Sequence, residues 1–405
     1  MKIRSITVFH ASAWPLDETA LQRAGEFASV AQDACRSAGY DVQTVRLALP
    51  PFPAWLPRQE DIPAVAQVLE AAARAQGFAY LSLGPALPDQ PWSYEVLPSI
   101  IAATENTFVS GAMTSPQQGI SLTAVRACAD VIHALAAQRS DGFANLYFAA
   151  LANVPAGAPF LPAAYHDGGA PAFAVALEAA DLAVTAFDGA PNLRVARQSL
   201  VEQIEAHAQA LQAIAEILTN RFEIRFGGLD CSLAPYPEEA RSLGAALEHL
   251  GVPVVGGHGS LAAAAFLAEC IDRAKFRRVG FSGLMLPVLE DARLARRAAD
   301  GALSVKDLLL FSAVCGTGLD TIPLPGDTSA DELYPVLLDL AALATRLRKP
   351  LTARLMPMPG KTAGDEITFA FPYFADSRVM ALQALPLQGA WLSGETFDLN
   401  PRPAA

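Results

Sequence analysis

The sequence predicts an α/β protein whose strands form one large barrel. Apolar strand patterns alternate with helical patterns along nearly the whole chain, and about ten to twelve segments qualify as strands. This alternation is typical of α/β architectures. So many strands exceed what most open sheets carry, which favours closure. No linker or internal repeat divides the sequence, so we expect one domain over residues 1–405, with about ten barrel strands and surrounding helices.

The elements can be assigned in chain order from periodicity and from helix stop signals such as Gly39. Strands are predicted at residues 3–9, 40–48, 78–84, 107–110, 145–153, 171–178, 223–230, 252–255, 320–325, 351–358 and 367–374, with an unassigned segment at 278–284. Helices are predicted at residues 17–39, 60–76, 92–104, 120–138, 194–219, 237–250, 260–273, 290–300, 304–315 and 329–348.

The composition indicates a large core and some surface hidden by a partner. Hydrophobic residues make up 52% of the 405 residues, charged residues only 17%, and the mean hydropathy is +0.27. A chain of this length can bury such a core. Because exposed apolar area without a partner is a liability, we also expect a homo-oligomer.

The charge and the cysteines constrain the partners and the compartment. A formal net charge of −12 argues against nucleic acid, whose phosphates need a basic face. No stretch of about 18 apolar residues lacks charges or helix breakers, so no membrane span is expected. The N-terminus lacks the layout of a signal peptide. The five cysteines are scattered and odd in number, which fits a reducing cytoplasm.

The segment 226–239, FGGLDCSLAPYPEE, places polar side chains directly after an apolar strand. In α/β folds, ligands lie beyond the carboxyl ends of the strands. Asp230 and Ser232 are therefore candidates to contact a substrate or a metal. The alternative is that Asp230 only stabilises a turn, as aspartate does routinely.

A glycine-rich loop at 256–260, GGHGS, leads into an alanine-rich helix. Gly257 and Gly259 would let the backbone approach a ligand, and the helix N-terminus would favour an anion. His258 is a candidate base or ligand. Ser260 either contacts the ligand or caps the helix.

Cys315 and Asp320 lie at the junction between a helix and a strand in SAVCGTGLD. Cys315 is a candidate nucleophile or radical site, although a lone cysteine is more often a small buried apolar residue. Asp320 is a candidate carboxylate partner.

Three further segments carry candidates. Asn153 follows a strand, and His166 lies in the proline- and glycine-containing loop after it. Glu105 precedes a short strand, and a long polar loop leads to the helix that carries Arg126. Arg126 either reaches an anionic ligand or forms a surface ion pair. Lys361, in PGKTAGD, either contacts a phosphate or lies at the tip of a hairpin between the two last strands.

Taken in order, these motifs resemble the family of domain of unknown function 711, whose members are often labelled pyruvate formate-lyase-like. The matching pieces are GISLTAV, AN followed by PF and H in 152–166, LDCSLAP, GGHGS, SAVCGTGLD, PGDT and PGK-x-x-GD. The resemblance implies an α/β barrel similar to that of glycyl radical enzymes. It implies no known reaction.

The sequence departs from glycyl radical chemistry at its C-terminal end. Those enzymes carry the loop R-V-x-G-aromatic, in which the glycine holds the radical. Here the string RVMAL places Ala381 at that position. The chain is therefore not expected to be a functional glycyl radical enzyme.

The leading functional hypothesis is an enzyme that acts on a small polar or anionic metabolite inside the barrel. His166, His258, Asp230 and Asp320 would act as acid–base groups or would bind zinc, iron or manganese. One alternative is a regulatory protein that binds an anion without turnover. Another is a redox enzyme that depends on Cys315.

Overall fold

A computed structural model describes residues 1–11, 14–57, 61–115 and 119–400. Its centre is a nine-stranded sheet in the order β10-β11-β7-β4-β3-β2-β1-β8-β9. The strands are β1 (Lys2–Phe9), β2 (Val42–Ala48), β3 (Tyr80–Ala86), β4 (Thr107–Ala112), β7 (Phe148–Ala152), β8 (Ala172–Glu178), β9 (Arg225–Ala234), β10 (Gly318–Pro325) and β11 (Leu351–Met358). The predicted α/β class is confirmed.

The sheet contains two strand directions. The five central strands β1, β2, β3, β4 and β7 are parallel to one another. β8 is antiparallel to β1, and β9 is parallel to β8. On the other side, β11 is antiparallel to β7, and β10 is parallel to β11. The carboxyl ends of these four outer strands therefore meet the amino ends of the five central strands.

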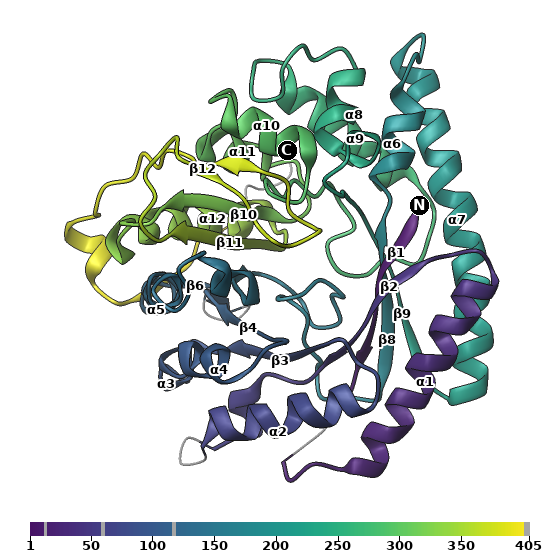
Figure 1. Cartoon of the computed structure of the whole chain (residues 1–405), viewed down its shortest axis with the longest axis vertical. Coiled ribbons are helices and arrows are strands. Elements are labelled where there is room, and N and C mark those ends of the chain that lie inside the picture. The colour runs from purple at the N-terminus through teal and green to yellow at the C-terminus, as the bar shows by residue number, and fades with distance from the viewer. Residues whose placement is uncertain (12–13, 58–60, 116–118, 401–405) are drawn as a thin grey trace.

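Twelve helices are assigned in the described part of the chain, and those packed on the sheet lie along its outer side (Figure 1). They are α1 (Glu18–Ser37), α2 (Ile62–Ala75), α3 (Trp92–Glu95), α4 (Leu97–Ala103), α5 (Leu122–Ala136), α6 (Ala180–Phe187), α7 (Leu193–Phe222), α8 (Leu243–His249), α9 (Ser260–Arg273), α10 (Ala292–Ala299), α11 (Val305–Phe311) and α12 (Ala330–Leu347).

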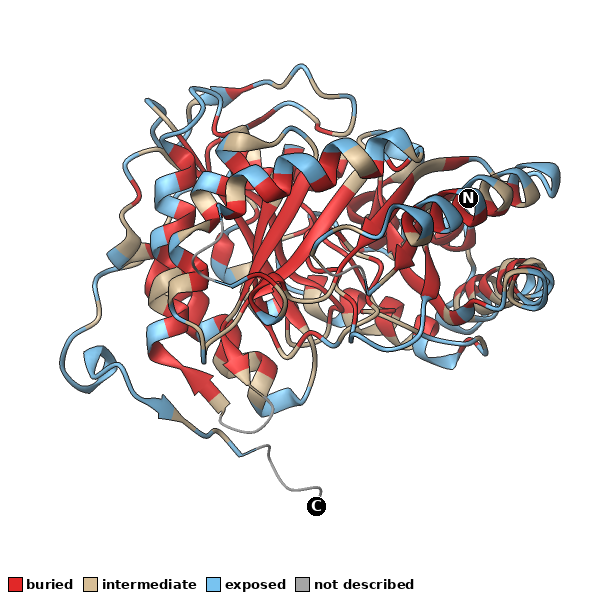
Figure 2. Ribbon diagram, turned by 90° about the horizontal axis from the view of Figure 1, so that it is seen from below, coloured by how far each residue is buried: buried red, intermediate tan, exposed pale blue. Residues whose placement is uncertain are grey.

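Local sequence accounts for several helix starts. Asp17 caps α1 by accepting a hydrogen bond from the Ala20 amide at 3.0 Å. At α12, Ser329 and Glu332 form a reciprocal capping box. The strands are buried on both faces, and every residue of β7 and β11 is buried (Figure 2). This is why they read as continuous apolar runs.

The predicted barrel is not confirmed, because β9 and β10 do not pair with each other. Residues 277–289 lie between these two edges and bond to both. The Leu229 amide donates to the Arg277 carbonyl at 2.8 Å, and the Val288 amide donates to the Asp320 carbonyl at 3.0 Å. This segment makes isolated bridges to each edge rather than a continuous ladder.

Two predicted strands are wrong in whole or in part. Residues 252–255 form no strand, and only Val255 makes an isolated bridge, to Gly257. At 367–374, pairing stops after β12 (Glu366–Ile367), which pairs with β13 (Ser377–Arg378). Pro253 and Pro372 lack the amide that a ladder needs. A separate three-stranded sheet has the order β14 (Thr396–Phe397), β6 (Gly119–Ser121) and β5 (Thr114–Ser115).

The loop after β7, residues 153–171, runs into the interior of the curved sheet. Its Pro159 carbonyl accepts a hydrogen bond from Thr7 of β1 at 3.3 Å, and its Ala164 carbonyl accepts one from Ser82 of β3 at 2.6 Å. Leu161 and Ala164 pack with Phe9, Ala48 and Phe108 from three strands. The loop therefore fills much of the interior and closes it from one end.

Candidate functional site

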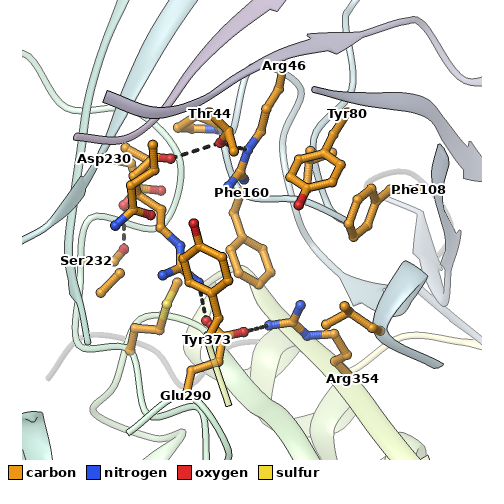
Figure 3. Close-up of a pocket in the computed structure, with 18 of the residues that line it drawn as sticks. Thr44, Arg46, Tyr80, Phe108, Phe160, Asp230, Ser232, Glu290, Arg354 and Tyr373 are labelled. Atoms are coloured by element: carbon orange, nitrogen blue, oxygen red, sulfur yellow. Dashed lines mark hydrogen bonds and ion pairs between the residues drawn. The ribbon is translucent and has the colours of Figure 1, made fainter. Parts of the chain in front are cut away.

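The interior cavity lies between this loop and the carboxyl ends of the outer strands (Figure 3). Its lining includes Arg4, Thr44, Arg46, Tyr80, Phe108, Tyr147, Phe160, Asp230, Ser232, Glu290, Arg354, Phe371 and Tyr373. The cavity volume is about 90 Å³. A buried water needs roughly 10–15 Å³ by that measure, so the cavity has room for a small organic molecule.

A row of side chains with alternating negative and positive charge lies beside the cavity. Glu178 bonds Arg241 at 2.7 Å and Arg4 at 3.3 Å. Arg4 also pairs with Glu290, and Glu290 bonds Arg354 at 2.7 Å. Arg354 then bonds Asp320 at 2.6 Å. Buried charges are costly unless they are paired. These ion pairs therefore explain how Arg4, Arg354 and three acids are held inside the protein.

Arg46 of β2 is the exception to this pairing. Its side chain is directed into the cavity, and the residue is only 8% exposed (Figure 3). Its Nε donates to Thr44 Oγ1 at 2.9 Å. Within the described residues, its two Nη atoms have no hydrogen-bond acceptor and it pairs with no carboxylate. Burial, and then repulsion from Arg4, lower its pKa to about 10. Glu290 opposes this shift from a distance, so what Arg46 lacks among the described residues is a carboxylate in direct contact.

Aromatic rings form much of the cavity wall, and each of its arginines lies over one. The guanidinium carbon is 5.0 Å from the ring centre for Arg4 over Tyr373, 5.7 Å for Arg46 over Tyr80 and 5.5 Å for Arg354 over Phe160. Guanidinium groups are attracted to the faces of aromatic rings at such distances. Tyr80 in turn packs edge-on against Phe108 at 5.3 Å. The site is thus cationic at a few points and apolar between them.

Asp230 and Ser232, both named from the sequence, lie together in this cavity at the carboxyl half of β9. Asp230 accepts hydrogen bonds from the Phe281 and Ser282 amides, each at 3.0 Å, and from the Ser232 hydroxyl. Gly280 adopts φ +66°, and a Cβ there would lie 2.2 Å from the Asp230 carboxylate. Burial raises the pKa of Asp230 although these bonds oppose the shift.

Asp320 lies just behind the cavity wall and acts on it through Arg354. It is fully buried, and its Oδ2 has no hydrogen-bond partner. Burial raises the pKa of Asp320, and the positive charge of Arg354 lowers it by a smaller amount. Asp320 therefore orients an arginine of the cavity without lining the cavity itself.

His166 lies at the opposite end of the sheet from Asp230. Its amide donates to the Leu49 carbonyl at 3.0 Å, just past the end of β2. The ring is buried, with Nδ1 accepting from the Gly168 amide at 3.3 Å and Nε2 3.3 Å from the Ala170 carbonyl. Burial lowers its pKa. The imidazole is satisfied by its own loop and does not line the interior cavity.

The glycine-rich loop is also remote from the cavity. His258, Gly257 and Gly259 are exposed on the surface. Gly259 is the residue that caps α9, whereas Ser260 is the first helical residue. The Ser260 hydroxyl donates to the Gly257 carbonyl at 2.7 Å and so serves the loop itself.

The remaining candidates are dispersed. Cys315 is buried, and its carbonyl accepts from Lys349. Arg126 pairs with Asp331 at 2.6 Å, and Glu105 with Arg74 at 3.5 Å. Asn153 lines a separate hollow. Lys361 is exposed in a turn but not at the tip of a hairpin. The strand before it, β11, pairs with β10 and β7 and not with the strand after it, β12.

The predicted metal site does not form. Over residues 1–11, 14–57, 61–115 and 119–400, no group of three or more His, Cys, Asp or Glu side chains is arranged to hold a metal ion. The four residues named for it occupy different places: Asp230 lines the cavity, Asp320 lies behind it, and His166 and His258 are elsewhere.

Sequence reasoning missed the arginines and Glu290 that define the cavity. A signal was present in three strands, KIRSITVF, VQTVRLA and LTARLMPM, each of which carries one arginine within a largely buried strand sequence. Arginine is rarely buried without a partner, so each of these positions marks either an ion pair or a ligand. Glu290 gave no comparable signal, because it lies in the irregular stretch before α10.

The fold and the cavity define an α/β protein with an arginine- and aromatic-lined interior. The chain belongs to the family described as Uncharacterised ACR (DUF711), which it matches over residues 1–376. It is 36% identical over 277 residues to a UPF0210 protein of Pyrobaculum aerophilum, covering 62% of this chain but only 57% of that relative. It is 30% identical over 369 residues to a UPF0210 protein of Methanopyrus kandleri, covering 86% and 82%.

The family resemblance read from the motifs is thus confirmed, whereas neither the fold nor these relatives support a likeness to glycyl radical enzymes. No described helix is both long and apolar enough to cross a membrane.

Proposed function

We propose that the protein is an enzyme that binds a small anionic molecule in the interior cavity. The observation that carries this proposal is Arg46, a buried guanidinium that contacts no carboxylate of the described residues and lies in a largely aromatic cavity. An anionic ligand would supply the direct partner that Arg46 lacks. Convergent polar groups in an apolar pocket are the usual form of a small-molecule site.

Asp230 is the acid–base candidate within the cavity. It is a carboxylate with a raised pKa, and Ser232 lies beside it and donates to it. Carboxyl groups tuned upward by burial can hold or release a proton near neutral pH. We assign Asp320 a positioning role through Arg354. His166 and His258 have no role at this cavity.

A second candidate function is anion binding without turnover. It is favoured by the way in which two backbone amides and Ser232 occupy the Asp230 carboxylate. Such bonds tie the carboxylate to the junction between β9 and residues 277–289. In this version Asp230 holds the cavity wall and takes no part in chemistry.

We also propose that residues 1–405 form one domain and that residues 277–289 complete the sheet as a barrel-like container. Support comes from the backbone bonds that this segment makes to β9 and to β10. The container explains how a charged cavity can lie so far inside the chain.

Calorimetric titration with formate, acetate and phosphate tests the binding part of the proposal. Wild type is expected to bind at least one of these anions, and Arg46→Met to bind it roughly tenfold more weakly or worse. Arg46→Lys should retain part of the affinity, and Arg296→Met, at an exposed site, should retain all of it. Equal affinity in Arg46→Met and wild type would contradict the proposal.

Incubation with a metabolite extract, followed by mass spectrometry, separates the two functions. Conversion of a compound by wild type but not by Asp230→Asn supports the enzyme. Binding that depends on Arg46, with no compound consumed, supports the non-catalytic version.

A further inference from the structure

We infer that the ligand of the interior cavity is a small aromatic monocarboxylate, with its carboxylate on Arg46 and its ring against the aromatic wall. The inference rests on the proposed anion-binding function and specifies its chemical class. Three features of the cavity support it: the number of free charges, the geometry of the free donors, and the nature of the remaining wall.

The pairing of the cavity arginines leaves a place for one anionic group. Arg4 and Arg354 each pair with Glu290, and each also pairs with a second acid, Glu178 or Asp320. Of these three arginines, only Arg46 has no carboxylate partner among the described residues. A ligand with one negative charge can pair with Arg46, whereas a second charge would be buried with no arginine free to pair with it. A phosphate monoester carries about −1.5 to −2 at neutral pH and so fits less well.

The free donors of Arg46 match a carboxylate. Because Nε is engaged by Thr44 Oγ1, the two Nη atoms at the tip of the guanidinium remain. These two nitrogens are coplanar and can bond both oxygens of a carboxylate in parallel. The bond to Thr44 also limits rotation of the guanidinium, so that less freedom is lost when an anion binds. Thr44 is itself held, since its hydroxyl donates to the Arg4 carbonyl at 3.0 Å.

The rest of the wall favours a flat apolar body. Six aromatic side chains line the cavity: Tyr80, Phe108, Tyr147, Phe160, Phe371 and Tyr373. Figure 3 shows the rings of Tyr80, Phe160 and Tyr373 around the space into which Arg46 projects. Aromatic pairs in offset or edge-on contact contribute beyond their buried area.

Isothermal titration of the full chain with four probes at pH 8 tests the class of ligand. Benzoate is expected to bind most tightly. Acetate, which lacks the ring, should bind roughly tenfold more weakly or worse. Cyclohexanecarboxylate, similar in size but not flat, should bind about two- to tenfold more weakly. Phenylphosphate, with its second charge, should bind about tenfold more weakly or worse.

Matched variants assign the two halves of the ligand. Arg46→Met should abolish measurable benzoate binding, and Arg46→Lys should leave it weakened. Phe160→Leu should reduce the preference for benzoate over acetate. Phe276→Leu is the control, because this phenylalanine also lies under an arginine, Arg278 at 4.5 Å, but outside the cavity. Circular dichroism checks that each variant is folded.

The possible failures are distinguishable. Equal affinities for benzoate, cyclohexanecarboxylate and acetate, all lost in Arg46→Met, would overturn the aromatic class and leave anion binding standing. Tighter binding of phenylphosphate would overturn the single-charge argument. Benzoate binding that survives Arg46→Met would place the ligand elsewhere. If no anion, including formate and inorganic phosphate, bound to folded wild type, the proposed function would fail as well.

Discussion

Arg46 and Arg354 line the same cavity but have opposite surroundings. Arg354 bonds Glu290 and Asp320, both of which are buried. Arg46 bonds only the Thr44 hydroxyl. Removing one member of a buried ion pair leaves its partner uncompensated, whereas removing an unpaired buried charge removes a cost. Binding sites commonly trade stability for function in this way.

This difference predicts opposite effects of one substitution on stability. Arg354→Met should lower the free energy of unfolding by about 3–5 kcal/mol. Arg46→Met should leave it within about 1 kcal/mol of wild type, or raise it, in the absence of ligand. Urea unfolding of both variants in the same buffer measures the two values. A loss of more than 3 kcal/mol in Arg46→Met would show that Arg46 is a structural residue.

Asp230 predicts a pH dependence of stability. Its pKa in the folded protein is raised above the ordinary value of 3.8, mainly by burial. The folded state therefore holds this proton more tightly than the unfolded state. The resulting stabilisation is fully present below pH 3.8 and is lost as the pH rises through the folded pKa. Asp230→Asn has no such proton, so its stability relative to wild type should rise with pH.

Urea unfolding of wild type and Asp230→Asn at pH 4 and pH 8 checks this sign. The difference in unfolding free energy, variant minus wild type, should be more positive at pH 8. A difference that is constant, or that falls with pH, would show that the hydrogen bonds to the Asp230 carboxylate outweigh its burial.

Among individual residues, the acids of the cavity could be predicted from the sequence better than its arginines. Asp230 and Ser232 were found because they end or follow an apolar strand, a position that carries meaning in any α/β fold, and Asp320 was found because it opens one. Arg4, Arg46 and Arg354 lie within strands, where facing inward or outward depends on the packing of both faces. That packing is a tertiary property, so their role needed the structure.

Among the elements, residues 277–289 are packed closely against neighbouring backbone. A Cβ on Gly283 would lie 2.6 Å from the Cα of Gly316, backbone against backbone. The same segment supplies the amides that bond Asp230, and it carries Met285 of the cavity lining. Its position is therefore coupled to the cavity.

Gly283→Ala should consequently destabilise the fold by about 1–3 kcal/mol and weaken anion binding. Gly169→Ala is the matched control, because the nearest atom to a Cβ there is an oxygen of the Asp167 side chain, at 3.1 Å, which can move. Thermal unfolding and titration of both variants provide the comparison. An unchanged midpoint in Gly283→Ala would mean that the segment yields to the added carbon.

Strand positions were predicted well, but strand directions were not. The apolar runs at 3–9, 145–153 and 351–358 are intrinsic to the sequence, since both faces of these strands are buried. Whether β8 runs parallel or antiparallel to β1 depends on the path of residues 153–171 through the interior. With all strands assumed parallel, His166 and Asp230 would share an end of the sheet, and in the folded chain they do not.

For the whole molecule, the family match ends at residue 376, and the chain continues as an arm over α5 and α12. β14 in this arm pairs with β6, and the Tyr334 hydroxyl donates to the Trp391 carbonyl at 2.6 Å. The arm carries three exposed apolar side chains, Leu385 at 81%, Trp391 at 46% and Leu392 at 54% exposure. None of the arm residues up to 400 lines the interior cavity.

Ending the chain after residue 387 should therefore leave a folded protein with unchanged anion affinity. Its thermal midpoint should fall, by about 2–4 °C for each kcal/mol of lost contacts in a domain of ordinary size. Light scattering of the full and shortened chains also checks the expected homo-oligomer, which remains a prediction. Loss of anion binding on shortening would tie the arm to the cavity.

The floor of the cavity and its charged wall come from different stretches of the chain. Pro159, Phe160 and Leu161 in the loop after β7 form the floor, whereas Arg4, Arg46 and Arg354 project from strands. Insertions and deletions accumulate in loops far more readily than in buried strands. The depth of the cavity and its arginines can therefore change independently in evolution. A change in loop length can admit a longer or shorter molecule while the arginine that holds its anionic end stays the same.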